Sequence, residues 1–177
     1  MKLAIADPPY LGRSVRWYGE GGRGSGSGRH RADVHPDAAE WDNPDRHREL
    51  VRQLRQDFDG WAIAATPSSL PLYLAEAPDV RVMIWHKRNS PPSGSRMRNV
   101  WEPVLVSSAR KAHGTGPRLN DVLDTAAPRR NFAGSKPAAW TRWVLDALGY
   151  DAGTDEVVDL FAGSGSVTAE VLQGVLL

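Results

Sequence analysis

Short apolar runs that end in turn-forming residues recur along the chain and predict the strands of a buried sheet. The first run lies at Lys2–Ala6 and stops at two prolines. The last run lies at 156–161 and leads into a glycine-rich turn. Comparable runs at 61–66, 80–85 and 101–107 predict further strands between them.

Amphipathic segments fall between these runs and predict helices. Apolar side chains recur on one face of residues 44–58, and Asp42 or Asn43 can cap the first turn. The same reasoning assigns helices to 67–77, 137–148 and 167–176. Strands that alternate with helices indicate one α/β domain, residues 1–177, built on a largely parallel sheet.

Two polar stretches lack this periodicity. Residues 12–36 are rich in glycine, serine and arginine and are expected to form a mobile loop, whereas 109–133 should be irregular apart from one turn near Val122. Basic residues gather in the first stretch and again at 86–98, where they could contact phosphates. The alternative is that these charges are solvated and keep the protein soluble.

Composition excludes several kinds of chemistry. The net charge is +1, so the chain as a whole lacks the strongly basic character of many nucleic-acid binders. The sequence has no cysteine, which removes disulfides, thiol nucleophiles and CxxC zinc sites. Its five histidines lack tight ligand spacing, so no catalytic metal is expected. No apolar run approaches the roughly 20 residues of a membrane helix, and the chain does not begin like a secretion signal, so a cytoplasmic protein is expected.

The motif Val157-Val-Asp-Leu-Phe-Ala-Gly-Ser-Gly-Ser166 couples a predicted strand to a predicted helix through a glycine turn. Such a turn lets a ligand approach the backbone and directs free N–H groups at a polar or anionic group. A dinucleotide fingerprint would need glycine at position 168, which is Thr168. The motif therefore favours a nucleotide-like ligand without a nicotinamide, or it is simply a tight strand-to-helix turn.

The tetrapeptide Asp7-Pro8-Pro9-Tyr10 ends the first predicted strand. Its two prolines fix the backbone, so the Asp7 carboxylate and the Pro8 carbonyl project in set directions. Two acceptors beside an aromatic ring suit a planar ring that carries an amino group. Taken alone, the tetrapeptide could also be a rigid turn.

Together the two motifs resemble those of the amino-methyltransferases of DNA. With the tetrapeptide first and the glycine motif near the end of the chain, their order is that of the circularly permuted β-group of this family. Gly134-Ser-Lys-Pro137 resembles the Lys-Pro segment that closes over the methionine end of the methyl donor in that group. Residues 85–89 and 101–106 also resemble a strand pair of these enzymes.

The resemblance implies a fold and a set of site residues. The fold would be the Rossmann-like α/β fold of S-adenosylmethionine-dependent methyltransferases, circularly permuted and lacking the last strands, since eleven residues follow Ser166. In the family, the first of these strands carries an acidic ribose ligand, which another part of the chain or a second subunit would replace. The residues expected to hold the target amine are Asp7, Pro8, Pro9 and Tyr10. The residues expected to bind S-adenosyl-L-methionine are Lys136, Asp159, Phe161, Gly163, Ser164, Gly165 and Ser166.

The implied substrate is double-stranded DNA, and restriction-modification is the role that the resemblance implies. Asp7 and the Pro8 carbonyl would accept both hydrogens of an exocyclic amine, while Tyr10 would stack on the flipped base. Residues 90–132 could form a small target-recognition insertion, and a homodimer or a second subunit is plausible. Methylation at cytosine C5 is excluded because it needs a cysteine adduct.

Three alternatives remain at the level of sequence. Adenine N6 is preferred to cytosine N4, because the family's cytosine enzymes more often carry serine before the two prolines. A catalytically weak or inactive methyltransferase-like DNA-binding subunit would share the same motifs. An amine methyltransferase that acts on RNA would share them as well.

Overall fold

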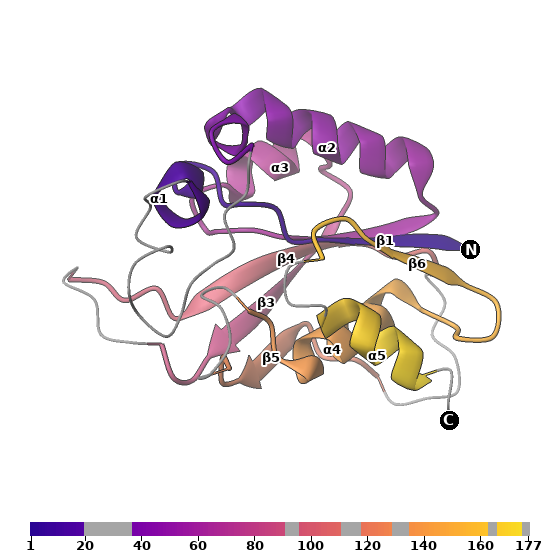
Figure 1. The fold of residues 1–177 in the computed structure, drawn as a ribbon. Helices are drawn as coiled ribbons and strands as arrows, with labels where there is room; N and C mark the ends of the chain where they lie inside the picture. Colours follow the sequence, from indigo (N-terminus) through magenta and orange to yellow (C-terminus); the bar gives the residue numbers. More distant parts are fainter. Residues whose placement is uncertain (20–36, 91–95, 111–117, 129–134, 163–165, 175–177) are drawn as a thin grey trace.

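The fold is that of a computed structural model, which describes residues 1–19, 37–90, 96–110, 118–128, 135–162 and 166–174. These residues form a six-stranded sheet in the order β5-β3-β4-β2-β1-β6 (Figure 1). The strands are β1 (Lys2–Ala6), β2 (Gly60–Ala64), β3 (Arg81–Lys87), β4 (Trp101–Ser107), β5 (Val122–Thr125) and β6 (Glu156–Asp159).

The sheet is parallel except for β4. Strand β1 runs parallel to both of its neighbours, so that Ile5 lies opposite Ala62 of β2 and opposite Asp159 of β6. Strand β4 runs antiparallel to β2 and to β3, and β3 is parallel to β5. The prediction of a largely parallel sheet is therefore confirmed. The first and last strands of the sequence are hydrogen-bonded neighbours.

Helices cover both faces of the sheet (Figure 1). Helices α2 (Pro44–Asp57) and α3 (Leu70–Glu76) lie on one face. Helices α4 (Ala138–Leu148) and α5 (Ser166–Gly174) lie on the other. The Asn43 side chain caps α2 by accepting a hydrogen bond from the Asp45 N–H at 3.0 Å. Helix α4 ends at Gly149, whose φ of 74° is the left-handed conformation that favours glycine.

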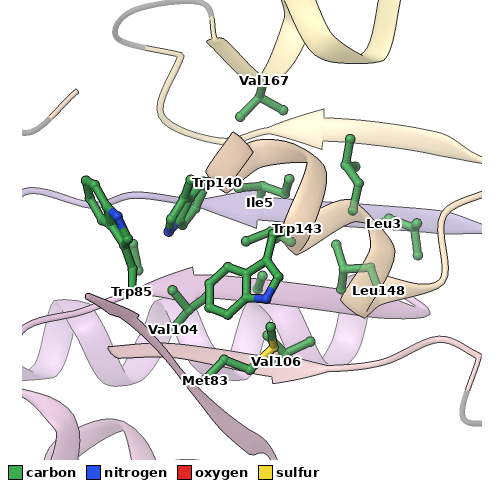
Figure 2. Packing of buried hydrophobic residues seen from close by; sticks show 14 residues of the cluster. Leu3, Ile5, Met83, Trp85, Val104, Val106, Trp140, Trp143, Leu148 and Val167 are labelled. Carbon is green, nitrogen blue, oxygen red and sulfur yellow. The ribbon is translucent and has the colours of Figure 1, made fainter. Parts of the chain in front are cut away.

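Alternation along β1 divides the core into two clusters. Leu3 and Ile5 pack on the α4 side of the sheet, whereas Ala4 and Ala6 pack on the α2 side. Figure 2 shows three tryptophans, Trp85, Trp140 and Trp143, in the cluster between α4 and the sheet. Aromatic side chains of this size bury more apolar surface than any others, so this cluster anchors α4 on the sheet.

Two expectations about the polar stretches were wrong. Within 12–36, residues Ser14–Tyr18 form a helix, α1, where a loop was predicted. Its first amides are capped by the Asp42 carboxylate, which accepts from the Ser14 N–H at 2.9 Å and the Val15 N–H at 3.2 Å. The turn predicted near Val122 is strand β5, which pairs with β3 at the edge of the sheet. Both elements depend on partners distant in sequence, which the local pattern does not reveal.

The described part of the chain contains no helix that is both long and apolar enough to span a membrane.

Candidate active site

The two sequence motifs meet at the carboxyl ends of neighbouring parallel strands. Asp7-Pro8-Pro9-Tyr10 follows β1 directly, and Leu160 and Phe161 follow β6. The Leu160 N–H donates to the Ile5 carbonyl at 3.0 Å, which continues the pairing of the two strands up to the motifs. In open α/β sheets, ligands bind outside the carboxyl ends of the strands. The fold therefore places both motifs where a ligand site is expected.

Lys136 is brought to the tetrapeptide from a distant part of the chain. Its Nζ lies 2.9 Å from Asp7 Oδ1 and 2.7 Å from Asp7 Oδ2, and it donates to the Tyr10 hydroxyl at 3.1 Å. The following residue, Pro137, precedes the first turn of α4. Helix α4 therefore fixes the lysine at the end of β1, and Lys136, Asp7 and Tyr10 form one connected group.

Glu102 is a member of this group that the sequence reasoning did not single out. The Tyr10 hydroxyl donates to Glu102 Oε2 at 3.1 Å, and Lys87 Nζ donates to Glu102 Oε1 at 2.6 Å. Lys136 Nζ lies 3.7 Å from Glu102 Oε2. A signal was present in the sequence, since Glu102 is the one ionisable residue of the apolar strand β4 and a buried carboxylate needs a partner.

We call these five residues the charged cluster. Its members are Asp7, Tyr10, Lys87, Glu102 and Lys136. Two carboxylates are balanced by two ammonium groups, and the tyrosine hydroxyl bridges Glu102 and Lys136. Pairing of this kind is what allows ionised groups to remain in a largely buried site.

The neighbours shift the pKa values within the charged cluster in different directions. Burial raises the pKa of Asp7 above its usual value, and Lys136 offsets this only in part. Burial also acts to raise the pKa of Glu102, but Lys136 and Lys87 outweigh it and the net pKa is lowered. For Lys136, burial acts to lower the pKa, but Asp7 and Glu102 outweigh it and the pKa is raised. Burial, together with Glu102 and Asp7, raises the pKa of Tyr10, so its hydroxyl keeps its proton.

Exposure distinguishes the two carboxylates of the charged cluster. The Asp7 side chain is 31% exposed, whereas that of Glu102 is 12% exposed. Lys136, which contacts both, is 4% exposed. A molecule that approaches the cluster from solvent therefore meets Asp7 before it meets the other two groups.

The glycine motif, residues 157–166, which we call the donor motif after its expected ligand, is described in part. The Asp159 carboxylate accepts from the Phe161 N–H at 3.1 Å, and burial raises the pKa of Asp159. The Phe161 ring packs edge-to-face on Trp41 with 5.0 Å between ring centroids. Gly163, Ser164 and Gly165 lie outside the described residues, as does the side chain of Ser166.

A pocket of about 250 Å³ lies beside Phe161. Its remaining lining residues come from the end of β6, from the segment before α2 and from α2 itself: Asp37, Glu40, Trp41, Arg46, Leu50, Gln53 and Leu160. An aromatic ring with acidic and amide groups around it can accommodate a ligand that has an apolar face and polar edges.

The 3-10 helix η2 (Glu40–Asp42) is held beside this pocket by a buried histidine. Trp41 offers a carbonyl, which can only accept, so the 2.7 Å contact requires the proton on His47 Nε2. His47 Nδ1 then accepts from the Tyr73 hydroxyl at 2.6 Å. Burial lowers the pKa of His47, in keeping with a neutral ring. We call Trp41, His47 and Tyr73 the neutral cluster; the sequence reasoning missed it.

Among the described residues, no group of three or more histidines and carboxylates could hold a metal ion.

Comparison with known proteins finds likeness in structure alone. No family model matches the sequence, and no curated protein matches it. Among solved structures, the M1.HpyAVI–SAM complex aligns with a TM-score of 0.61 at 15% identity, over 98% of this chain and 77% of that one. TTHA0409, a candidate DNA modification methylase from Thermus thermophilus, complexed with S-adenosyl-L-methionine, aligns with a TM-score of 0.53 at 17% identity, over 95% and 74%. The chain therefore has the Rossmann-like α/β fold of these methyltransferases.

Proposed function

We propose that the protein transfers a methyl group from S-adenosyl-L-methionine to an exocyclic amine of a DNA base, most favourably adenine N6. The observation that supports the proposal is that the two motifs meet side by side, at the ends of the neighbouring strands β1 and β6. A partly exposed carboxylate, Asp7, lies at the end of β1, and the Leu160 N–H bond to Ile5 holds the donor motif beside it. A transfer between two bound molecules needs this kind of adjacency.

The residues at the end of β6 fit part of the donor. Phe161 offers an aromatic surface for the adenine, and the acidic and amide groups of the adjoining pocket suit ribose hydroxyls. We assign Asp159, Gly163, Ser164, Gly165 and Ser166 to the polar end of the molecule, as the sequence resemblance implies. The resemblance also assigns Lys136 to this end, and in the structure its ammonium contacts Asp7 and Tyr10. When bound, S-adenosylmethionine supplies an electrophilic methyl group on a sulfonium sulfur.

The tetrapeptide would activate the acceptor. The exocyclic nitrogen of adenine is a poor nucleophile, because its lone pair is delocalised into the ring. Asp7 and the Pro8 carbonyl would accept its two hydrogens, which favours a tetrahedral nitrogen with a localised lone pair, and Pro9 would keep these acceptors rigid. The Tyr10 ring would stack on the base, which offsets a cost of a few kcal/mol for its removal from the duplex. No covalent intermediate with the protein is needed.

The order of the motifs supports a circularly permuted, β-group arrangement. The tetrapeptide strand comes first in the sequence and the donor-motif strand comes last, yet the two are neighbours in the sheet. Residues 101–107 and 122–125 of the segment 90–132 are sheet strands, so we assign DNA recognition to the rest of that segment. Arg96, Arg98 and Arg118, which are exposed, belong to it. A second subunit, a cytoplasmic location and a role in restriction-modification remain predictions.

The test is a transfer assay with an identified product. Purified protein is incubated with methyl-labelled S-adenosylmethionine and unmethylated duplex DNA or RNA, and the digested nucleosides are analysed by mass spectrometry. N6-methyladenine from DNA is the expected result. N4-methylcytosine would overturn the base assignment but keep the chemistry, and a product from RNA alone would overturn the choice of DNA. Donor binding without any product would indicate an inactive DNA-binding subunit.

A further inference from the structure

Lys136 lies between two carboxylates at unequal distances. Its Nζ is 2.7 Å from the nearer oxygen of Asp7 and 3.7 Å from Glu102 Oε2. A charge-assisted hydrogen bond is typically about 2.7–2.9 Å long, so a displacement of about 1 Å would exchange one partner for the other. The lysine therefore has a second carboxylate within reach.

The proposed reaction makes conflicting demands on Asp7. Both of its carboxylate oxygens are engaged by Lys136, but one of them must also accept a hydrogen of the incoming amine, while the Pro8 carbonyl accepts the other. When the amine binds, the lysine must give up part of this contact. The Lys136 side chain is 4% exposed, so its ammonium group cannot turn to solvent, and a buried ammonium is best stabilised by a carboxylate even though the Tyr10 hydroxyl also accepts from it.

Glu102 is placed to resolve this conflict. It lies deeper than Asp7, at 12% exposure against 31%, so a substrate that reaches Asp7 does not compete for Glu102. Lys87 binds its other oxygen, Oε1, which leaves Oε2 directed at Tyr10 and Lys136. The pKa of Glu102 is lowered and that of Lys136 is raised, so both groups are charged at neutral pH.

We propose that Glu102 is a positioning residue that takes over the Lys136 ammonium when Asp7 binds the substrate amine. The inference rests on the proposed function. Asp7 is thereby released for the acceptor without leaving a buried charge unpaired. In the absence of a charge at position 102, Lys136 has Asp7 as its remaining carboxylate partner in the cluster, and the amine must compete with it.

The substitution Glu102→Gln tests this, because it keeps the shape of the side chain and removes its charge. We expect kcat to fall about 10- to 100-fold, as for other small displacements of catalytic groups, while the donor Kd stays within about twofold. Glu156→Gln is the matched control: it neutralises an exposed carboxylate at the start of β6, at the other end of the strand from the motifs, and should leave kcat unchanged.

A double-mutant cycle separates this role from a structural one. If Glu102 acts through Lys136, then Glu102→Gln should change kcat less than about twofold in a Lys136→Met background. An equal loss of kcat in both backgrounds would overturn the proposal. If Glu102→Gln does not fold, Glu102→Asp replaces it in the double-mutant cycle, since it withdraws the carboxylate from Lys136 by one methylene and keeps the charge.

The results also distinguish this inference from the proposed function. A wild-type protein that methylates no nucleic acid overturns the proposed function, and the inference with it. An active wild type whose Glu102→Gln variant retains full kcat overturns the inference alone.

Discussion

The charged cluster and the neutral cluster are both buried polar groups, but they are satisfied in different ways. In the neutral cluster, the His47 ring has one partner on each nitrogen, the Trp41 carbonyl and the Tyr73 hydroxyl. In the charged cluster, the Lys136 ammonium donates to Asp7 and to the Tyr10 hydroxyl, and it also lies 3.7 Å from Glu102 Oε2. The polar groups of the neutral cluster can pair in one way, whereas the Lys136 ammonium of the charged cluster has two carboxylates within reach.

This difference suggests different uses. A neutral chain of matched donors and acceptors fixes neighbouring elements at little electrostatic cost, and His47 is fully buried. The four charged groups of the charged cluster contribute little net stability, because their removal from water is costly, and one of them, Asp7, remains partly exposed. We therefore expect the neutral cluster to hold the fold and the charged cluster to serve chemistry.

Asp7→Asn should have the largest effect. It removes the charge that accepts the amine hydrogens, and we expect methyl transfer to fall at least about 1,000-fold. The melting temperature should change little, because Lys136 retains Glu102. Methyl incorporation and circular dichroism melting measure the two effects. Asp57→Asn, at the exposed end of α2, is the control, and an Asp7→Asn variant with a tenth of normal activity would contradict the assignment.

His47→Ala should act on stability instead. It leaves a cavity and two unpaired polar groups, at a cost of about 2–4 kcal/mol in the free energy of unfolding. Urea denaturation measures this loss. The kcat of the folded variant should remain within about threefold of the wild type at a temperature where both are folded. A loss of activity without a loss of stability would reverse the roles assigned to the two clusters.

The pH dependence of transfer should report on Asp7. Its raised pKa means that kcat/KM declines on acidification at a higher pH than an ordinary aspartate would give, since the protonated carboxyl is a much weaker acceptor of the amine hydrogen than the carboxylate is. Lys136 acts to lower this pKa, so Lys136→Met should move the acidic limb to still higher pH. A pH–rate profile for each protein tests the sign. An acidic limb that moves to lower pH in the variant would show that another group titrates.

The same small change in each cluster should give the sharpest contrast. Tyr73→Phe removes a hydroxyl from the neutral cluster and should cost about 1 kcal/mol of stability with kcat unchanged. Tyr10→Phe keeps the stacking ring but removes the bridge between Lys136 and Glu102, so it should lower kcat severalfold with little change in stability. Parallel unfolding and transfer measurements on both variants decide the point. Equal effects would mean that the clusters do not differ in kind.

Much of the scaffold could be predicted because it is encoded locally. The apolar run at Lys2–Ala6 and the amphipathic pattern of residues 44–58 specify β1 and α2 nearly to the residue. The tetrapeptide and the glycine motif mark the site because each combines a strand end with unusual backbone chemistry. Their adjacency follows from the parallel sheet.

The rest depends on contacts between distant residues. Helix α1 is capped by Asp42, which lies 28 positions after Ser14. Strand β5 is short and half exposed, so its sequence has no apolar run from which a strand could be predicted. In the sequence, Glu102 and His47 cannot be told from ordinary polar residues, because their partners Lys136 and Tyr73 are brought to them only by the fold. Chemistry that arises from partners far apart in sequence leaves little local signal.

The position of β1 between β2 and β6 has a consequence for biosynthesis. Strand β1 leaves the ribosome before its partner β6, which follows roughly 150 residues later. At about 5–20 residues per second, one edge of β1 waits on the order of 10–30 s for its neighbour. Asp7 likewise waits for Lys136. The nascent chain therefore carries the tetrapeptide well before the site can assemble, which requires β6 and Lys136 to have been synthesised.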